Sequence, residues 1–233
     1  MRKGKIIVFE GLDYSFKEYN SKRLYEYIKD NITEKVILLS FPNYQSNSSY
    51  FVNEYLQGKY GECSKVDERE CTLFYAMDRY DTIKKNNIYQ LLEQGYYIIM
   101  DRYIGSNLIF QTAKIYNNIE KGNDIFTEEI IDNYIDWALE LELEILKLPQ
   151  WDTVIYMNMP LRVSYPLMKE RDLKNGKEED GHESNKKFLE SVELNAIKLC
   201  NKLDWSIVNC VDDNDNIKKE DEIFNEIRSI LFL

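Results

Sequence analysis

The 233-residue sequence predicts an α/β fold in which a five-stranded parallel sheet is flanked by helices, making three layers. Five short apolar runs are spaced along the chain, and each is continuous rather than alternating, as expected for strands covered on both faces. Longer stretches with helical periodicity separate these runs. Strands that alternate with helices form doubly wound parallel sheets, and such sheets bind ligands at the carboxyl ends of their strands.

The predicted elements follow one another in order. The strands are "KIIVFEG" at 5–11, "KVILLSF" at 35–41, "YYIIMDR" at 96–102, "DTVIYMNM" at 152–159 and "WSIVNCV" at 205–211. The longest helical stretches are 17–32, 67–93 and 127–146. The first repeats apolar residues at positions 24, 28 and 32, and the second is ended by Gly95. The third opens on Thr127, a suitable N-cap, followed by two glutamates in the first turn.

One segment departs from this alternation. Residues 169–187, "KERDLKNGKEEDGHESNKK", are highly charged and almost free of apolar side chains. The segment fits either a solvated surface loop or a lid that closes over a ligand. Pro166 stands just before it, inside an otherwise helical stretch, where a proline would bend the chain leading to the lid.

Length and composition predict one domain spanning residues 1–233, because 233 residues at 44% hydrophobic content suffice for one sizeable core. No run of about 18 apolar residues appears, and the basic start leads into a short strand rather than a signal peptide. We therefore expect a cytoplasmic protein without a membrane partner. The cysteines lack metal-binding spacing and the chain has a single histidine, which argues against zinc.

The formal net charge of -11 argues against nucleic-acid binding, which needs a cationic surface. It leaves room for a small phosphorylated ligand, because a few Lys and Arg side chains that converge in a cleft can outweigh dispersed acidic groups.

The loop after the first strand resembles a phosphate-binding loop with two altered positions. Such a loop reads Gly, four residues, Gly, Lys, then Ser or Thr, and its backbone amides wrap phosphate oxygens at a helix N-terminus. Gly11 and Lys17 have this spacing, whereas Phe16 replaces the second glycine and Glu18 the hydroxyl residue. The pattern fits either a working nucleotide site or the relic of one.

Two further pairs suit a phosphorylated ligand. Asp101 and Arg102 end the third strand, where they would place a hard oxygen ligand and a phosphate-binding fork at the edge of the sheet. Tyr75 and Arg79 are four residues apart, so a ring and a guanidinium would share one helix face. The alternatives are an ion pair at the strand end, and a core tyrosine beside a surface arginine.

Taken in order, "FEGLD" with Lys17, "FP" after the second strand, "DRY" after the third and the following "SNLIFQ" resemble the thymidylate kinase family over nearly the whole chain. The resemblance implies a P-loop kinase fold, usually a homodimer, that transfers the γ-phosphoryl group of ATP to dTMP with Mg2+.

The resemblance also assigns roles to individual residues. It implies catalytic roles for Lys17, Arg102 and the lid's Arg171, and places Mg2+ at Glu18 and Asp101. The expected ATP-binding residues are Gly11, Tyr14, Ser15, Phe16, Lys17 and Glu18. The expected dTMP-binding residues are Asp13, Phe41, Pro42, Tyr75, Arg79, Arg102, Asn107 and Gln111. Among these, Tyr75 would stack on thymine and Gln111 would bond the pyrimidine edge.

The chain departs from the family at several of these positions. Tyr44 replaces an arginine that often follows the Phe-Pro pair, and Tyr14 supplies no loop arginine, which leaves Arg171 in the lid as the candidate. Phe16 would either turn its ring into the core or narrow the phosphate cradle. A carboxylate at Glu18 can meet Mg2+ directly or through water. A bacterial branch of the family carries the same Lys-Glu pair, which favours a functional variant.

These observations predict phosphorylation of dTMP to dTDP. Two alternatives stay open. A deoxynucleoside kinase would share the fold but offers no partner for an acceptor-phosphate arginine such as Arg79. A non-catalytic nucleotide-binding protein would explain Tyr14, Phe16 and Tyr44 together.

Overall fold

The structure is a computed structural model that describes residues 3–118, 124–175 and 186–233. In these residues, five parallel strands form one sheet in the order β2-β3-β1-β4-β5. The strands are β1 (Lys5–Glu10), β2 (Val36–Ser40), β3 (Tyr97–Asp101), β4 (Thr153–Asn158) and β5 (Ser206–Asn209). The predicted α/β fold with its five parallel strands is therefore confirmed.

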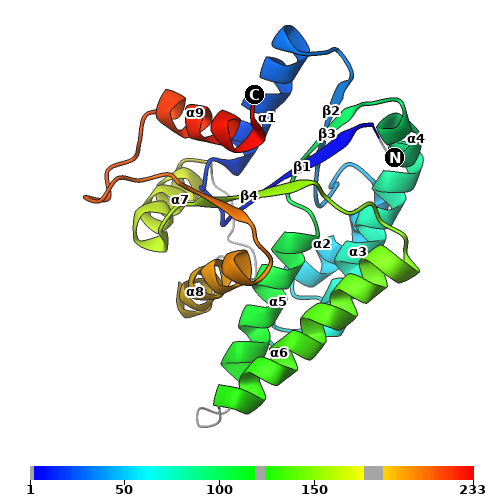
Figure 1. The fold of residues 1–233 in the computed structure, drawn as a ribbon. Coiled ribbons are helices and arrows are strands. Elements are labelled where there is room, and N and C mark those ends of the chain that lie inside the picture. Colours follow the sequence, from blue (N-terminus) through cyan, green and yellow to red (C-terminus); the bar gives the residue numbers. More distant parts are fainter. Residues whose placement is uncertain (1–2, 119–123, 176–185) are drawn as a thin grey trace.

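Helices cover both faces of this sheet, which gives the three predicted layers (Figure 1). In the view of Figure 1, α1 (Lys17–Asn31) and α9 (Glu220–Leu231) lie above the sheet, and α5 (Ile104–Asn118), α6 (Asp124–Leu139) and α8 (Lys186–Lys202) lie below it. The remaining helices are η1 (Asn47–Ser49), α2 (Tyr50–Leu56), α3 (Glu68–Lys85), α4 (Ile88–Glu93), η2 (Glu140–Ile145) and α7 (Leu161–Asn175).

The continuous apolar runs of the strands are explained by two large hydrophobic clusters, one on each face of the sheet. Alternate residues of β1 enter opposite clusters: Ile6 and Val8 pack with α3, α5, α6 and α8, whereas Ile7 and Phe9 pack with α1 and α9. Because side chains of a strand point alternately to its two faces, a strand covered on both sides must be apolar at every position.

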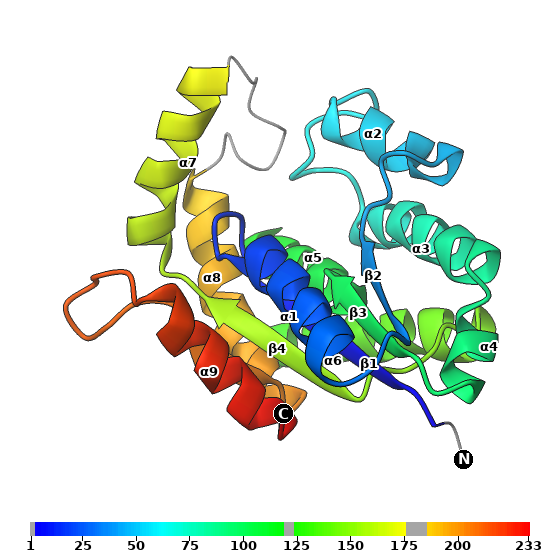
Figure 2. The same ribbon diagram turned by 90° about the horizontal axis from the view of Figure 1, so that it is seen from above.

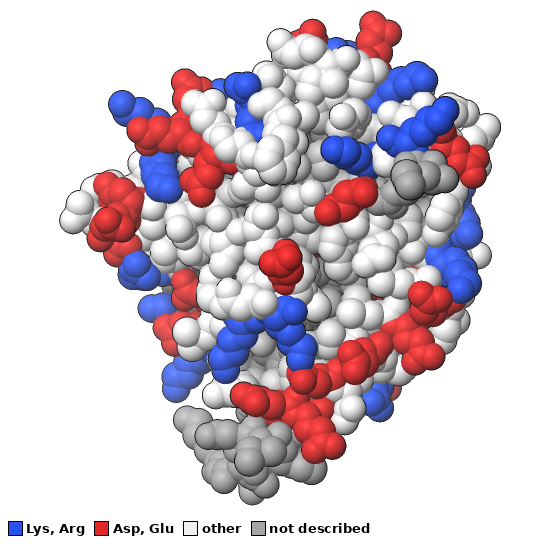
Figure 3. Space-filling model, in the orientation of Figure 1, with Lys and Arg blue, Asp and Glu red and all other residues white. Residues whose placement is uncertain are grey.

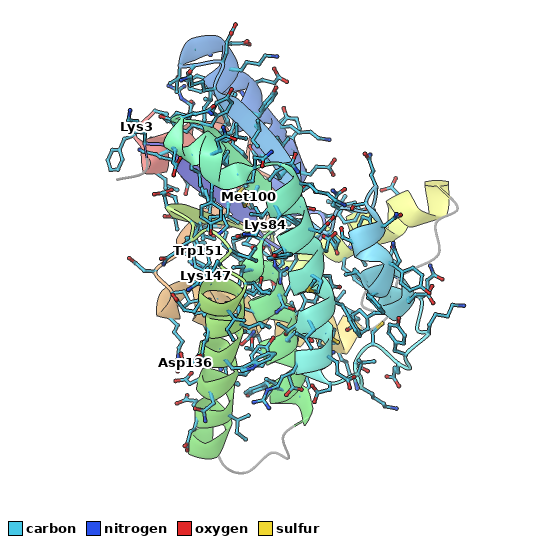
Figure 4. The ribbon with its side chains drawn as sticks, turned by 90° about the vertical axis from the view of Figure 1, so that its right-hand side faces the viewer. Lys3, Lys84, Met100, Asp136, Lys147 and Trp151 are labelled. Atoms are coloured by element: carbon cyan, nitrogen blue, oxygen red, sulfur yellow. The ribbon has the colours of Figure 1, made fainter. Side chains whose placement is uncertain are left out.

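Two helix boundaries differ from those the sequence predicted. The stretch 67–93 is broken after Lys85 into α3 and α4, because Asn87 adopts a left-handed conformation with φ 51°. Asparagine accepts this conformation more readily than most residues. The stretch 127–146 begins earlier, at Asp124, and its last turn, η2, is a π-helix. Figure 4 views this side of the molecule, with Lys84 near the end of α3 and Lys147 just after η2.

The predicted lid is described in part. Residues 169–175 are the last turns of α7, which contains Pro166, and residues 176–185 lie outside the described residues. The side chain of Arg171 is also outside the description, so its catalytic role stays a prediction.

The carboxyl ends of the strands form the edge of the sheet at which the sequence predicts ligand binding. Seen from above in Figure 2, the loop that leads into α1 lies between α7 on one side and α2 on the other. No helix in the described residues has both the length and the apolar character that crossing a lipid bilayer requires. All four cysteines are buried and unbridged.

Candidate active site

The loop between β1 and α1 forms a tight turn that depends on glycine at its start. Gly11 has φ 153°, and a Cβ atom there would lie 2.5 Å from Ser15 Oγ and 2.9 Å from the carbonyl oxygen of Met157. Any other residue would therefore clash with backbone that cannot move freely. The turn delivers the chain to the N-terminus of α1, where the helix dipole and free amides favour an anion.

Two aromatic residues of the loop hold left-handed conformations. Phe16, which precedes α1, has φ 62°, and Tyr14 has φ 63°. The Phe16 ring packs against the cluster formed by α1, α9 and the sheet, while Tyr14 packs with Leu161 and Met168 of α7. Phe16 therefore takes the backbone conformation expected of the missing glycine and turns its ring toward the core, although it also borders the cavity described below.

Lys17 lies in the first turn of α1 and is 8% exposed. Its Nζ donates to the carbonyl oxygen of Leu12 at 3.3 Å and to Asp13 Oδ1 at 3.4 Å. Burial lowers the pKa of Lys17, and the nearby Arg102 lowers it further, against the opposing charge of Asp13. A ligand that brought negative charge to this ammonium group would relieve both effects.

Arg102 follows β3 and has φ 66°. Its Nη1 donates at 3.1 Å to the carbonyl oxygen of Gly11 and at 3.1 Å to Ser106 Oγ, and its Nη2 pairs with Asp13. Burial alone would raise the pKa of Asp13, but the charges of Arg102 and Lys17 hold it well below its usual range. The third strand and the phosphate loop are thus joined by one carboxylate and two cations.

Glu10 lies behind Arg102 and was missed by the sequence analysis. It is completely buried, accepts a hydrogen bond from the Tyr103 backbone N–H at 2.9 Å and accepts another from Ser106 Oγ. Ser106 in turn accepts from Arg102, so Glu10 supports the guanidinium through one hydroxyl. Burial raises the pKa of Glu10. A charged residue inside an otherwise apolar strand, directly before Gly11, was the signal available in the sequence.

Asp101 and Glu18 are suited to hold Mg2+ together with ligand phosphates. Asp101 is 7% exposed, and its Oδ1 is buried with no hydrogen-bond partner among the described residues. Burial raises the pKa of Asp101, against the attraction of Lys17 and Arg102. The exposed carboxylate of Glu18 pairs with Lys22 at 2.6 Å. In the described chain, no three His, Cys, Asp or Glu side chains could hold a metal ion by themselves. A magnesium ion here would need oxygen ligands from phosphates and water.

On the opposite side of the cavity, α3 carries Tyr75 and Arg79. Arg79 donates from Nε and Nη2 to the two carboxylate oxygens of Glu142 on η2, both at 2.6 Å. Although burial alone would lower the pKa of Arg79, the charge of Glu142 raises it above its usual range. This pairing leaves Nη1 as the guanidinium nitrogen that Glu142 does not engage. Glu142 carries no signal in the sequence, because its partner is 63 residues away.

Helix α5 contributes two amide side chains, Asn107 and Gln111, one turn apart. Both are buried, and in each the carbonyl oxygen has no hydrogen-bond partner within the described ranges. Buried polar atoms without partners are uncommon in folded proteins, and because both residues border the cavity these oxygens are available to a ligand there.

The predicted site residues surround one cavity of about 540 Å³ at the carboxyl ends of the strands. Every predicted site residue whose side chain the structure describes borders it except Gly11, whose carbonyl oxygen accepts a hydrogen bond from Arg102. Those that border the cavity are Asp13, Tyr14, Ser15, Phe16, Lys17, Glu18, Phe41, Pro42, Tyr75, Arg79, Asp101, Arg102, Asn107 and Gln111. The sequence analysis did not assign Ser40, Leu56, Asp78, Tyr103, Ser106 or Phe110, which also border it.

The cavity gathers three cations although the chain as a whole is acidic. The net charge is -11, and Figure 3 shows acidic side chains gathered along the outer surface over α6. The exposed members there are Glu128, Glu129, Asp136, Glu140 and Glu144. Charges of both signs border the cavity: the cations are Lys17, Arg79 and Arg102, and the carboxylates are Asp13, Glu18, Asp78 and Asp101. Cations in a low-dielectric cleft act more strongly on an anionic ligand than dispersed surface charges do.

Comparison with known proteins identifies the family of this chain. The sequence profile of the family described as thymidylate kinase matches residues 9–221. Thymidylate kinase of Plasmodium falciparum (isolate 3D7) is 30% identical over 159 residues, which are 68% of this chain and 63% of that relative. Thymidylate kinase of Dictyostelium discoideum is 27% identical over 230 residues, or 99% of this chain and 86% of that relative.

The alignments to two other curated relatives cover 49% and 53% of their lengths. This chain therefore spans about half to two thirds of the length of several relatives that it matches. A solved structure of thymidylate kinase from Candida albicans has the same fold, with a TM-score of 0.70 and 24% identity, and the match covers 100% of this chain and 92% of that chain. With its strands, phosphate loop and matched profile in agreement, the chain belongs to the thymidylate kinase family.

Proposed function

We propose that this chain transfers the γ-phosphoryl group of ATP to dTMP and releases dTDP and ADP. The observation that carries the proposal is that phosphate-binding groups from β1 and β3 and nucleotide-binding candidates from α3 and α5 border one cavity. In such a reaction catalysis is positioning and charge neutralisation, because the attacking acceptor oxygen belongs to a phosphate and needs little help from a base.

The donor phosphates are assigned to the loop before α1. Backbone amides of Ser15 to Lys17 would bind the ATP phosphates at the helix N-terminus, and Lys17 would exchange its bonds to Leu12 and Asp13 for phosphate oxygens. Arg102, held against the loop by Gly11 and Ser106, would bridge the transferring group. Arg171 remains the candidate that the lid would add.

Mg2+ is proposed as the cofactor, held by Asp101 and Glu18 with phosphate oxygens completing its ligands. The unpartnered Oδ1 of Asp101 at the cavity fits this donor set. When bound, the ion would neutralise charge on the phosphates and keep them oriented.

The acceptor nucleotide is assigned to the side of the cavity bordered by α3 and α5. Tyr75 would stack on the base, Arg79 would use Nη1 for the acceptor, and Asn107 and Gln111 would bond the pyrimidine edge. Asp13 would approach the sugar, and Phe41 with Pro42 would border the nucleotide.

One titration separates this proposal from its alternatives. Purified protein is given magnesium-ATP with dTMP, thymidine or other nucleoside monophosphates while ADP release is followed. Fastest release with dTMP supports the proposal. Release with thymidine alone would identify a deoxynucleoside kinase, and dTMP binding without ADP release would identify a non-catalytic binding protein, as Tyr14, Phe16 and Tyr44 together suggested.

Substitutions test whether the residues of the cavity carry out the reaction. Lys17→Ala and Arg102→Ala should each lose most turnover, by about 10²-fold or more, because each removes a cation from the transferring phosphates. Lys202→Ala removes a surface cation that pairs with Asp132 and serves as the control. Turnover near that of the wild type in either cavity variant would reject the assignment. Gln111→Ala should weaken the choice of base and leave ATP binding unchanged.

We further propose one catalytic domain that forms a homodimer, as the family resemblance implies. Leu73 and Met77 on α3, which are 45% and 49% exposed, are apolar residues available for such an interface. Light scattering on purified protein tests the oligomeric state, and a monomer at working concentrations would reject it.

A further inference from the structure

Three buried side chains from three helices meet behind the α5 wall of the cavity. Thr72 comes from α3, Asn107 from α5 and Tyr134 from α6, and they are at most 4% exposed. The Thr72 and Tyr134 oxygens are 2.6 Å apart, and Asn107 Nδ2 lies 3.1 Å from Thr72 Oγ1 and 3.3 Å from the Tyr134 oxygen. Of the three, only Asn107 borders the cavity.

Counting the donors and acceptors in this cluster shows which group donates in each hydrogen bond. The Thr72 hydroxyl donates to the backbone oxygen of Glu68 at 2.7 Å, so its proton is committed. At the 2.6 Å contact the Tyr134 hydroxyl must therefore donate to Thr72. Thr72 Oγ1 then accepts from Tyr134 and from Asn107 Nδ2, and the Tyr134 oxygen also accepts from Asn107 Nδ2.

This arrangement fixes the orientation of the Asn107 amide. If Oδ1 and Nδ2 of Asn107 were exchanged, Oδ1 would face the oxygens of Thr72 and Tyr134. Both hydroxyl protons already point to other acceptors, so Oδ1 would receive no hydrogen bond there. In the orientation that the structure has, Nδ2 donates to both hydroxyl oxygens, and Oδ1 is left buried with no hydrogen-bond partner in the described chain. The Oε1 of Gln111, one helical turn later, is in the same situation. The α5 wall therefore offers hydrogen-bond acceptors to the ligand.

We propose that Tyr134 and Thr72 are positioning residues for base selectivity, because they hold Asn107 so that its carbonyl oxygen faces the acceptor-nucleotide base. This inference rests on the proposed function and adds to it the residues that hold the base-recognising amide in place. A fixed acceptor favours an imide base, thymine or uracil, whose ring N3–H is a donor. It disfavours cytosine, whose N3 is an acceptor and would leave two buried acceptors facing each other.

The test measures the dissociation constants of dTMP and dCMP without ATP, by calorimetry, for the wild type and for Tyr134→Phe and Thr72→Val. Each substitution removes one hydroxyl that restrains the amide. We expect the ratio of the dCMP to the dTMP dissociation constant to fall by about tenfold, the equivalent of one net hydrogen bond. A purely structural defect would weaken both nucleotides alike and would leave this ratio unchanged.

Thr112→Val is the matched control. Thr112 is a buried threonine on α5 that also donates to a backbone oxygen four residues earlier, Leu108, at 2.6 Å, and it accepts from Asn195 Nδ2. It does not border the cavity, so its loss should affect stability and leave the ratio unchanged.

The outcomes separate this inference from the proposed function. If the wild type binds neither nucleotide, the proposed function itself fails, and the inference fails with it. If the wild type prefers dTMP and Tyr134→Phe keeps the full preference, the inference is overturned while the proposed function stands. Because Tyr134→Phe keeps the ring and its packing, this variant decides the question even if Thr72→Val does not fold.

Discussion

Arg79 on α3 and Glu142 on the π-helical turn η2 form a buried ion pair with two parallel hydrogen bonds of 2.6 Å. Their side chains are 3% and 0% exposed. A π-helical turn contains an extra residue, and such turns are often found at functional sites. Here the turn carries Glu142, whose carboxylate orients an arginine that borders the cavity.

Glu142→Gln should destabilise the protein by about 3 kcal/mol, because it leaves the Arg79 charge buried without its partner. It should also raise the KM for the acceptor monophosphate more than that for ATP, since Arg79 loses its orientation. Chemical denaturation and initial-rate kinetics measure the two effects. Asp132→Asn breaks the exposed pair with Lys202 and should cost less than about 1 kcal/mol. Equal losses in the two variants would contradict a special role for the buried pair.

Glu10→Gln should lower kcat by about tenfold with little change in stability. The neutral amide can still accept from the Tyr103 N–H, but it loses the charge that supports Arg102 through Ser106. Burial raises the pKa of Glu10, so wild-type turnover should also fall in acid as this carboxylate gains a proton. The pH profile of turnover measures this effect, because the variant should lack the decrease in acid that protonation of Glu10 causes. An unchanged kcat would show that Ser106, Gly11 and Asp13 hold Arg102 without the charge of Glu10.

Asp101→Asn should have two separate effects, one on the pH dependence of stability and one on turnover. Burial raises the pKa of Asp101 above its ordinary 3.8, so between these two values the folded state binds a proton that the unfolded state has lost. The free energy of unfolding therefore falls as the pH rises through this interval, and the variant should lack that fall. Denaturation at a series of pH values measures it.

Turnover of Asp101→Asn with magnesium-ATP should be lost, because an amide is a poorer ligand for Mg2+. Asp136→Asn changes an exposed carboxylate on α6, labelled in Figure 4, and should keep wild-type activity. A fully active Asp101→Asn enzyme would contradict the proposed metal ligand.

Phe16→Gly should destabilise the protein by about 1 kcal/mol. Glycine relieves a left-handed conformation worth roughly 1–2 kcal/mol, but the variant loses the packing of a half-buried ring, about 2 kcal/mol, and some unfolded-state entropy. Asn87→Gly tests the backbone effect alone, since Asn87 is exposed with φ 51°, and it should stay within about 0.5 kcal/mol of the wild type. A stabilised Phe16→Gly protein would mean that the ring contributes little packing.

Local pattern was sufficient for much of this protein. The continuous runs around Ile6, Ile98 and Val154 predicted buried parallel strands, because a strand covered on both faces must be apolar throughout. The spacing of Gly11 and Lys17 after such a strand predicted an anion site at a helix N-terminus. The break at Asn87 was missed, because a single left-handed residue leaves little trace in a helical periodicity.

The sequence by itself therefore determined the sheet, the loop after its first strand and the edge of the sheet where the cavity lies, since periodicity and short-range spacing reflect the environment of each segment. Only the tertiary structure decided that Glu10 supports Arg102, that Glu142 orients Arg79, and that Tyr134 restrains Asn107. Each of these relations joins side chains from different elements. Such contacts depend on which buried donors and acceptors come together when the elements pack. No local pattern in the chain predicts these pairings.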